Sequence, residues 1–143
     1  EEYSWDNSAR IRYDGNHKVE GNGSYQFYLQ KGWSRWVLTM KNNQRIDISG
    51  YKQIKFAVSS VSAAKWDDFK IIIQDRDDNY MVAKLADLGF KPDGKFHWLI
   101  LEIEGIKQAG VDVSNLGKII QIAWGGSIGA NHSFHLDGLQ LLK

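Results

Sequence analysis

Residues 69–80 read Phe69-Lys70-Ile71-Ile72-Ile73-Gln74-Asp75-Arg76-Asp77-Asp78-Asn79-Tyr80. The first half is apolar at every second position, which is the period of a strand with one buried face. The second half is a run of Asp, Arg and Asn, and Asp and Asn are typical of turns. A second alternating segment, residues 80–85, follows directly. The stretch therefore predicts a β-hairpin. Its outward positions on the first strand are Lys70, Ile72 and Gln74.

The same pattern recurs along the chain. Short alternating segments bounded by Gly, Asn, Asp or Ser predict about eight or nine strands, at the spacing of an all-β sandwich. We expect strands at residues 9–13, 24–29, 37–40, 54–58, 69–74, 80–85, 96–103, 119–124 and 134–142. Helix signals are weak: residues 104–110 could form one turn, and residues 83–88 are ambiguous. The predicted fold class is all-β, with two antiparallel sheets in a jelly-roll β-sandwich, and residues 1–143 form one domain.

Composition narrows the function classes. The net charge is +1 and no run of five like charges occurs, so we expect neither a nucleic-acid partner nor an anionic membrane surface. No apolar stretch reaches about 18 residues, so no membrane-spanning helix is expected. The first residue is Glu1, which indicates a mature product or an excised module. Cysteine is absent, which excludes disulfides, thiolate metal sites and cysteine nucleophiles.

Signatures of catalysis are missing as well. The four histidines form no His-x-x-x-His or His-Glu-x-x-His pair, which a zinc hydrolase would show. A glycosidase needs two carboxylates, about 5 Å apart in retaining enzymes. The clustered acids Asp75, Asp77 and Asp78 lie in the predicted turn, where aspartates usually hydrogen-bond their own backbone. We therefore predict no catalytic residues.

Six tryptophans suggest a stacking surface. Trp33 and Trp36 lie in a polar Gly-Trp-Ser-Arg-Trp segment without apolar periodicity. An indole combines a large apolar face with one N–H donor, so a cluster in polar surroundings favours stacking against a ligand. The alternative is packing, because large aromatics are mostly buried, and this pair would then close the end of the sandwich. Trp98 is expected to reach the ligand face, whereas Trp124 is assigned to the core.

Polar side chains at outward positions of four predicted strands extend the candidate site. If these strands share one sheet, Tyr28, Gln74, Gln121 and His135 line its open face. An aromatic plane suits the C–H face of a pyranose, and amides and imidazole suit its hydroxyls. The alternative is that the outward face of any sheet is polar by default. The predicted ligand-binding residues are Tyr28, Trp33, Trp36, Gln74, Trp98, Gln121 and His135.

Four stretches carry a family resemblance: residues 23–27, 47–56, 98–103 and 134–141. In this order they resemble motifs of the β-sandwich carbohydrate-binding modules attached to bacterial plant-polysaccharide hydrolases, most closely family 11 and its relatives in families 30 and 44. The most specific motif is Asp47-Ile48-Ser49-Gly50-Tyr51-Lys52-Gln53-Ile54-Lys55-Phe56. The chain departs from the family pattern at two positions of the closing strand. His135 stands where an aromatic is frequent, and Gly138 replaces the second Asp of a pair.

The resemblance implies a non-catalytic module that binds plant polysaccharide on a concave sheet face, with β-glucan such as cellulose-like or mixed-linkage chains as the expected ligand. It implies secretion and a covalently linked catalytic domain that degrades plant cell walls. It also implies a structural calcium ion held by Glu20 and Asp137, although Asp137 could instead hydrogen-bond a neighbouring strand. Two other functions stay open: a protein-interaction or assembly sandwich that binds no sugar, and a small glycosidase or lyase domain.

Overall fold

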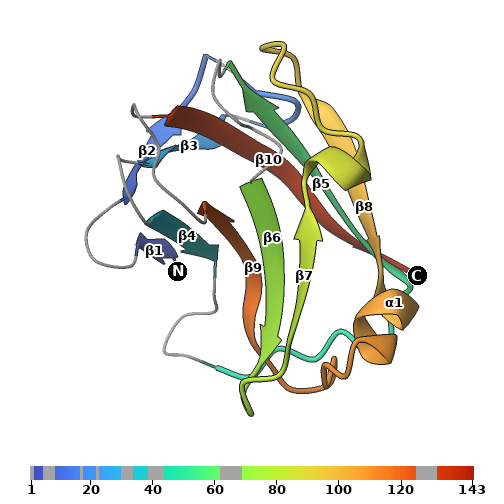
Figure 1. The fold of residues 1–143 in the computed structure, drawn as a ribbon. Helices are drawn as coiled ribbons and strands as arrows, with labels where there is room; N and C mark the ends of the chain where they lie inside the picture. The colour runs from blue at the N-terminus through green and yellow to red at the C-terminus, as the bar shows by residue number, and fades with distance from the viewer. Residues whose placement is uncertain are drawn as a thin grey trace.

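Two antiparallel sheets pack face to face in the computed structural model, which describes residues 2–4, 9–16, 18–21, 23–29, 34–38, 44–61, 69–124 and 132–143 (Figure 1). The first sheet has the order β1 (Glu2–Ser4), β4 (Ser34–Leu38), β9 (Leu116–Trp124), β6 (Phe69–Asp75) and β7 (Tyr80–Lys84). The second sheet has the order β2 (Ala9–Asp14), β3 (Ser24–Leu29), β10 (His132–Leu142), β5 (Gln53–Ser60) and β8 (His97–Glu102). This arrangement confirms the predicted antiparallel β-sandwich.

The core lies between the sheets and follows from the alternation in the sequence. Phe69, Ile71 and Ile73 of β6 are fully buried, while the residues between them are only half-buried. The ring of Phe69, from the first sheet, lies edge-on to that of Phe134, from the second, with 4.4 Å between their centroids. Burying one such side chain stabilises the fold by about 1.5–3 kcal/mol, so these alternating rows hold the two sheets together.

The segment that carries the most specific family motif is a structural turn. The carboxylate of Asp47 accepts hydrogen bonds from the backbone N–H of Ser49 (3.0 Å) and from its hydroxyl (2.6 Å). Ile48 between them is fully buried, and its N–H donates to the carbonyl of Val113. This motif therefore forms the turn through which the chain enters β5, and it gives no information about a ligand.

Most predicted elements are confirmed, with shifts at their ends. The expected strand at residues 37–40 lies earlier, at Ser34–Leu38, and the short strand β1 was not predicted. The turn at residues 104–110 is the helix α1 (Ile103–Gln108), which buries Ile103 and Ile106. The ambiguous segment 83–88 ends in the 3-10 helix η4 (Ala86–Leu88). Among the described residues, no helix is long and apolar enough to cross a membrane.

Candidate functional site

The predicted ligand-binding residues divide between the two sheets. Gln74 and Gln121 lie in β6 and β9 of the first sheet, whereas Tyr28 and His135 lie in β3 and β10 of the second. The condition that their four strands share one sheet is therefore not met. Alternation fixes which face of its own strand a residue occupies, but it does not fix which sheet the strand joins. The two outward faces must be considered separately.

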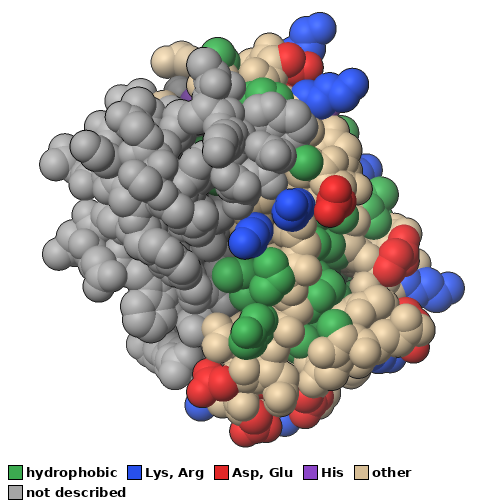
Figure 2. All heavy atoms as spheres, in the orientation of Figure 1, with side chains coloured by type: hydrophobic (Ala, Val, Ile, Leu, Met, Phe, Trp, Pro, Cys, Tyr) green, Lys and Arg blue, Asp and Glu red, His purple; other side chains and the backbone are tan. Residues whose placement is uncertain are grey.

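The outward face of the β6–β7 hairpin is apolar in its middle. We call its six outward side chains the β6–β7 face: Lys70, Ile72 and Gln74 of β6, and Tyr80, Val82 and Lys84 of β7. Tyr80 is 60% exposed and Val82 is 44% exposed. Val82 pairs directly with Ile72, and Tyr80 pairs directly with Gln74. Figure 2 shows hydrophobic side chains gathered over these two strands, next to basic ones.

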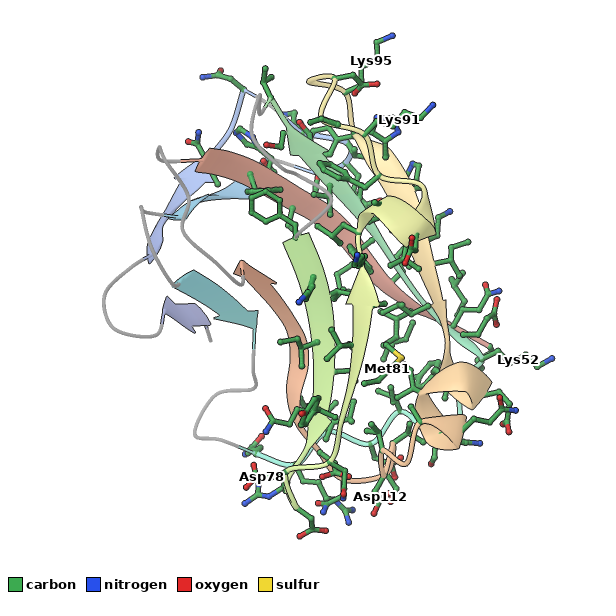
Figure 3. The ribbon with its side chains drawn as sticks, in the orientation of Figure 1. Lys52, Asp78, Met81, Lys91, Lys95 and Asp112 are labelled. Atoms are coloured by element: carbon green, nitrogen blue, oxygen red, sulfur yellow. The ribbon has the colours of Figure 1, made fainter. Side chains whose placement is uncertain are left out.

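The turn between the two strands fixes one end of this face. Asp75, which is buried, accepts hydrogen bonds from the backbone N–H groups of Asp77 and Asn79 and from the side-chain amide of Asn79, at 2.9–3.0 Å. It also accepts one from the N–H of Asp112, in the loop between α1 and β9. Figure 3 shows Asp78 and Asp112 at this end of the sandwich. Burial acts to raise the pKa of Asp75, but these hydrogen bonds outweigh it and lower the pKa.

A second amide interaction orients the site residue Gln74. Its side-chain Nε2 donates to Oδ1 of Asp78 at 3.0 Å. Asp78 has a positive φ of 64°, a conformation that Asp tolerates better than most residues. The turn therefore orients the amide of Gln74, whose register partner across the hairpin is Tyr80.

The outward face of the second sheet is occupied by protein contacts around Trp98. Its indole lies across β5 toward Gly138 of β10, where an added Cβ would meet the ring at 2.5 Å. Ala57 of β5, the register partner of Trp98 on one side and of Asp137 on the other, is fully buried. The ammonium group of Lys55 lies 4.5 Å from the centroid of the indole, within the range of a cation–π interaction. Trp98 is 40% exposed and faces away from the core as predicted, but its ring packs on this sheet.

His135 belongs to the same face as Trp98. It is half-buried, and its ring is edge-on to that of Phe96 at a centroid distance of 6.5 Å. Its register partners Gln26 and Ser59 are both buried. His135 and Trp98 thus lie in different rows of the same outward face, on the opposite side of the sandwich from Gln74.

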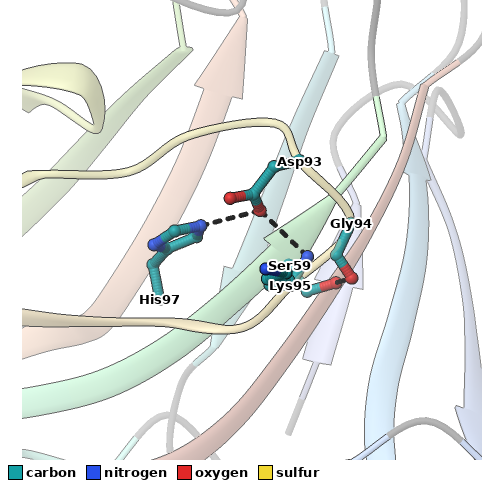
Figure 4. A network of polar contacts seen from close by, with 5 residues as sticks. All are labelled: Ser59, Asp93, Gly94, Lys95 and His97. Carbon is teal, nitrogen blue, oxygen red and sulfur yellow. Dashed lines mark hydrogen bonds and ion pairs between the residues drawn. The ribbon is translucent and has the colours of Figure 1, made fainter.

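A polar network fastens the loop before β8 to β5 (Figure 4). Oδ1 of Asp93 contacts Nε2 of His97 at 2.8 Å and accepts the backbone N–H of Lys95 at 3.0 Å. The hydroxyl of Ser59 donates to the carbonyl of Gly94 at 3.4 Å. The hydrogen bond with His97, followed by that of Lys95, lowers the pKa of Asp93. A catalytic triad requires the serine hydroxyl to bond to the histidine, and here the hydroxyl donates to a carbonyl, so the network supports a structural role.

The predicted calcium pair meets in a different way. Oδ2 of Asp137 accepts the backbone N–H groups of Val19 (2.7 Å) and Glu20 (3.0 Å), and Oδ1 accepts the N–H of Gly138. The Glu20 carboxylate contacts Nε2 of Gln140 at 3.4 Å. Calcium prefers six to eight oxygen ligands, and N–H groups directed at a carboxylate compete with a cation for it. The described residues contain no group of three or more acidic, His or Cys side chains suited to a metal ion. They fit calcium poorly, and the ion stays a prediction.

Four predicted positions are placed only by their backbone, or not at all. Trp36 is paired with Ile122, which is paired in turn with the buried Ile71 of β6. Gln121 is paired with Ile72 of the β6–β7 face. Trp33 lies outside the described residues, and the side chains of Trp36, Gln121 and Tyr28 are not described.

Sequence reasoning missed Tyr80 and Val82, although the signal was present. The hairpin places residue 80 opposite Gln74, and alternation places residues 80 and 82 on the same side. Two large apolar side chains on the outward side of an edge strand are unusual, because edge strands are commonly protected by charge.

No protein-family model matches the sequence, and no curated protein matches it. Solved structures do match. The family 30 carbohydrate-binding module of a cellulosomal cellulase of Clostridium thermocellum superposes with a TM-score of 0.75 at 12% identity, over 99% of this chain and 90% of that one. The family 11 module from the same organism, solved in complex with a β-1,3-1,4-mixed-linked tetrasaccharide, gives 0.68 at 13% identity, over 99% and 87%.

A longer enzyme contains the same fold. A β-1,2-glucanase from Parabacteroides distasonis matches with a TM-score of 0.69 at 13% identity, over 99% of this chain but only 23% of the glucanase. At these identities the likeness concerns the fold. The chain therefore has the β-sandwich fold of the family 30 and family 11 carbohydrate-binding modules, as its motifs predicted.

Proposed function

We propose that this domain binds a polysaccharide on the β6–β7 face and has no catalytic activity of its own. The observation that carries the proposal is the exposure of Tyr80 and Val82 beside Ile72 and the oriented amide of Gln74. A contiguous exposed apolar patch on a soluble domain commonly marks a binding surface. An aromatic ring next to an amide offers a stacking plane and a hydrogen-bonding group for the two kinds of surface that a sugar presents.

The choice of this face over the second sheet rests on what each aromatic side chain contacts. The indole of Trp98 packs toward Gly138 and lies under the Lys55 ammonium. Tyr80 is the more exposed of the two rings, 60% against 40%. A ring available to water can stack on a ligand without first breaking contacts within the protein.

The absence of catalysis is also part of the proposal. The six outward positions of the β6–β7 face hold no carboxylate, and the nearby Asp75 and Asp78 are engaged in the turn. A glycosidase would need two acids flanking the bound sugar. A binding domain would instead act by tethering a linked hydrolase near its substrate, which raises the effective concentration of the enzyme. We accordingly propose a secreted module linked to a catalytic domain, and mixed-linkage or cellulose-like β-glucan as the first ligand to test.

Trp33 is proposed to extend the surface along the first sheet. It directly precedes β4, which is joined to β6 through β9. Trp36 shares the row of the buried Ile71, which favours the packing alternative for it. Removal of Trp33 is expected to weaken retention without loss of the fold.

The test compares one exposed apolar side chain from each sheet. Affinity electrophoresis in gels with embedded polysaccharides identifies a ligand, and calorimetry gives its affinity. Tyr80→Ala should weaken binding by about 1–3 kcal/mol, by analogy with stacking on other ring-shaped ligands. The matched control is Ile100→Ala, which removes a 42% exposed side chain from the second sheet. If Ile100→Ala and Trp98→Ala weaken binding and Tyr80→Ala does not, the ligand binds to the second sheet. That result would contradict the proposal.

A further inference from the structure

All charged residues in register with the β6–β7 face are basic. Lys70 pairs with Lys84 on one side and with Ala123 of β9 on the other, and Ala123 pairs in turn with Arg35 of β4. This row crosses four strands and contains three basic residues. The next row is neutral: Val37, Gln121, Ile72 and Val82. The third row joins Lys118 to Gln74 and Tyr80.

These three rows hold four basic residues and no acidic one, although the chain as a whole has 18 Lys and Arg against 17 Asp and Glu. The outward rows of the second sheet are mixed. There, Lys55 of β5 lies between two rows that each contain an acid: Glu102 is paired with Gln53, and Asp137 is paired with Ala57. The basic positions are therefore concentrated on one face, in the rows on either side of its neutral row.

The arrangement carries a cost within the folded protein. Like charges directly opposite each other on neighbouring strands are destabilising, and Lys70 and Lys84 are such a pair. Among the described residues, neither lysine forms an ion pair with a carboxylate. Asp87, three residues after Lys84 in η4, makes no such contact with it. An anion bound from outside would remove this repulsion.

We infer that the ligand of the β6–β7 face is an anionic polysaccharide, whose carboxylate or sulfate groups bind between Lys70 and Lys84 while a neighbouring sugar stacks on Tyr80. This inference rests on the proposed polysaccharide site and replaces the neutral β-glucan suggested for it with a charged ligand. A neutral β-glucan would use the Tyr80, Gln74 and Val82 end of the face and leave the basic row without a partner. An ammonium group binds an anion as a point charge, so either a uronic acid or a sulfate ester suits it.

The experiment uses matched polysaccharides that differ only in charge. Glucuronoxylan is compared with its carboxyl-reduced form, and a sulfated galactan with its desulfated form, by affinity electrophoresis and calorimetry. The wild-type protein should bind one anionic form roughly three- to tenfold more tightly than its neutral counterpart, as expected for two exposed charge contacts. The pair that shows the difference identifies carboxylate or sulfate. Added salt should reduce the difference.

Two double variants with the same change in net charge locate the effect. Lys70→Gln/Lys84→Gln should abolish the preference for the anionic form and leave the melting temperature unchanged or higher, because the repulsion is gone. Lys91→Gln/Lys95→Gln changes two exposed lysines of the segment between η4 and β8, which belong to none of the three rows, and it should keep the preference (Figure 3). If both variants lose the preference for the anionic form equally, the effect depends on net charge alone and the inference is overturned.

The remaining outcomes separate this inference from the proposed function. The wild-type protein could bind the charged and neutral forms equally, and Tyr80→Ala could abolish that binding. This result would overturn the inference but support the polysaccharide site. Failure to bind any member of a broad glycan panel would overturn both.

Discussion

Gly138 is the residue at which the absence of a side chain matters most. It lies in β10 with a φ of 64°, within the irregular register between Asp137 and Gln140. A Cβ there would come within 2.5 Å of Cη2 and 2.8 Å of Cζ3 of Trp98. Both the backbone conformation and the space on the sheet therefore require glycine.

We predict that Gly138→Ala destabilises the fold by about 1–3 kcal/mol, through the strained φ and the overlap with Trp98. Urea denaturation gives the change in the free energy of unfolding. In a Trp98→Ala background the overlap is gone, so the same glycine substitution should cost less. Equal costs in the two backgrounds would show that Trp98 and Gly138 are not coupled.

Sequence alone revealed Gly138 only as a departure from a family pattern. Its partner Trp98 is distant along the chain, and the contact depends on β5 lying between their two strands. Alternation correctly assigned Trp98 to the outward side, opposite Leu99 and Leu101. What an outward indole touches is decided by its neighbours across the sheet, and the sequence of one strand does not contain that information.

At the scale of elements, the β6–β7 hairpin depends on the carboxylate of Asp75. Four hydrogen bonds end on this buried group, three from the turn and one from Asp112 in the loop before β9. All four donors are N–H groups. The ionised carboxylate thus joins the hairpin that bears Tyr80 and Gln74 to the neighbouring loop.

Asp75→Asn should destabilise the domain by about 2–3 kcal/mol at pH 7, because an amide directs its own N–H groups at some of these donors. The folded pKa is lower than the unfolded value of about 3.9, so this stabilisation is present above pH 4 and is lost as pH falls through the folded pKa. Chemical denaturation at pH 7, 5 and 3 should show the wild-type advantage shrinking at the lowest pH.

The matched control for this hairpin is Asp77→Asn, an exposed acid in the same turn, which should change the free energy of unfolding by less than about 0.5 kcal/mol. A wild-type advantage over Asp75→Asn that stays constant down to pH 3 would contradict the role of the ionised carboxylate.

The strands themselves were largely predictable, because alternation and turn residues are local signals. The exceptions have physical causes. The three-residue strand β1 is too short to display a period, and β4 begins at Ser34 inside a polar segment. The pattern could not predict that β3 and β10 belong to one sheet and β6 and β9 to the other. Strands with the same alternation can pack on either side of one core. For this reason the candidate site was predicted as a mixture of two faces.

At the scale of the whole molecule, Asp137 ties an early segment of the chain to its closing strand. Its Oδ2 accepts the N–H groups of Val19 and Glu20, which precede it by 118 and 117 residues. These hydrogen bonds bring the acid at this position to the region of Glu20. The bonding partner is the backbone of Glu20, whereas the calcium prediction uses its carboxylate.

This difference gives opposite expectations for two variants and for chelation. If the backbone N–H groups hold Asp137, Asp137→Asn should lower the melting temperature, with a loss of about 1–3 kcal/mol in stability. Glu20→Gln should have almost no effect, because its carboxylate contacts only the side chain of Gln140 among the bonds described, in an exposed hydrogen bond of 3.4 Å. EDTA should leave the wild-type melting curve unchanged. A calcium ion would instead make Glu20→Gln and EDTA both destabilising, and saturating calcium would raise the melting temperature. We expect the first pattern, since the three N–H groups directed at Asp137 already satisfy its negative charge.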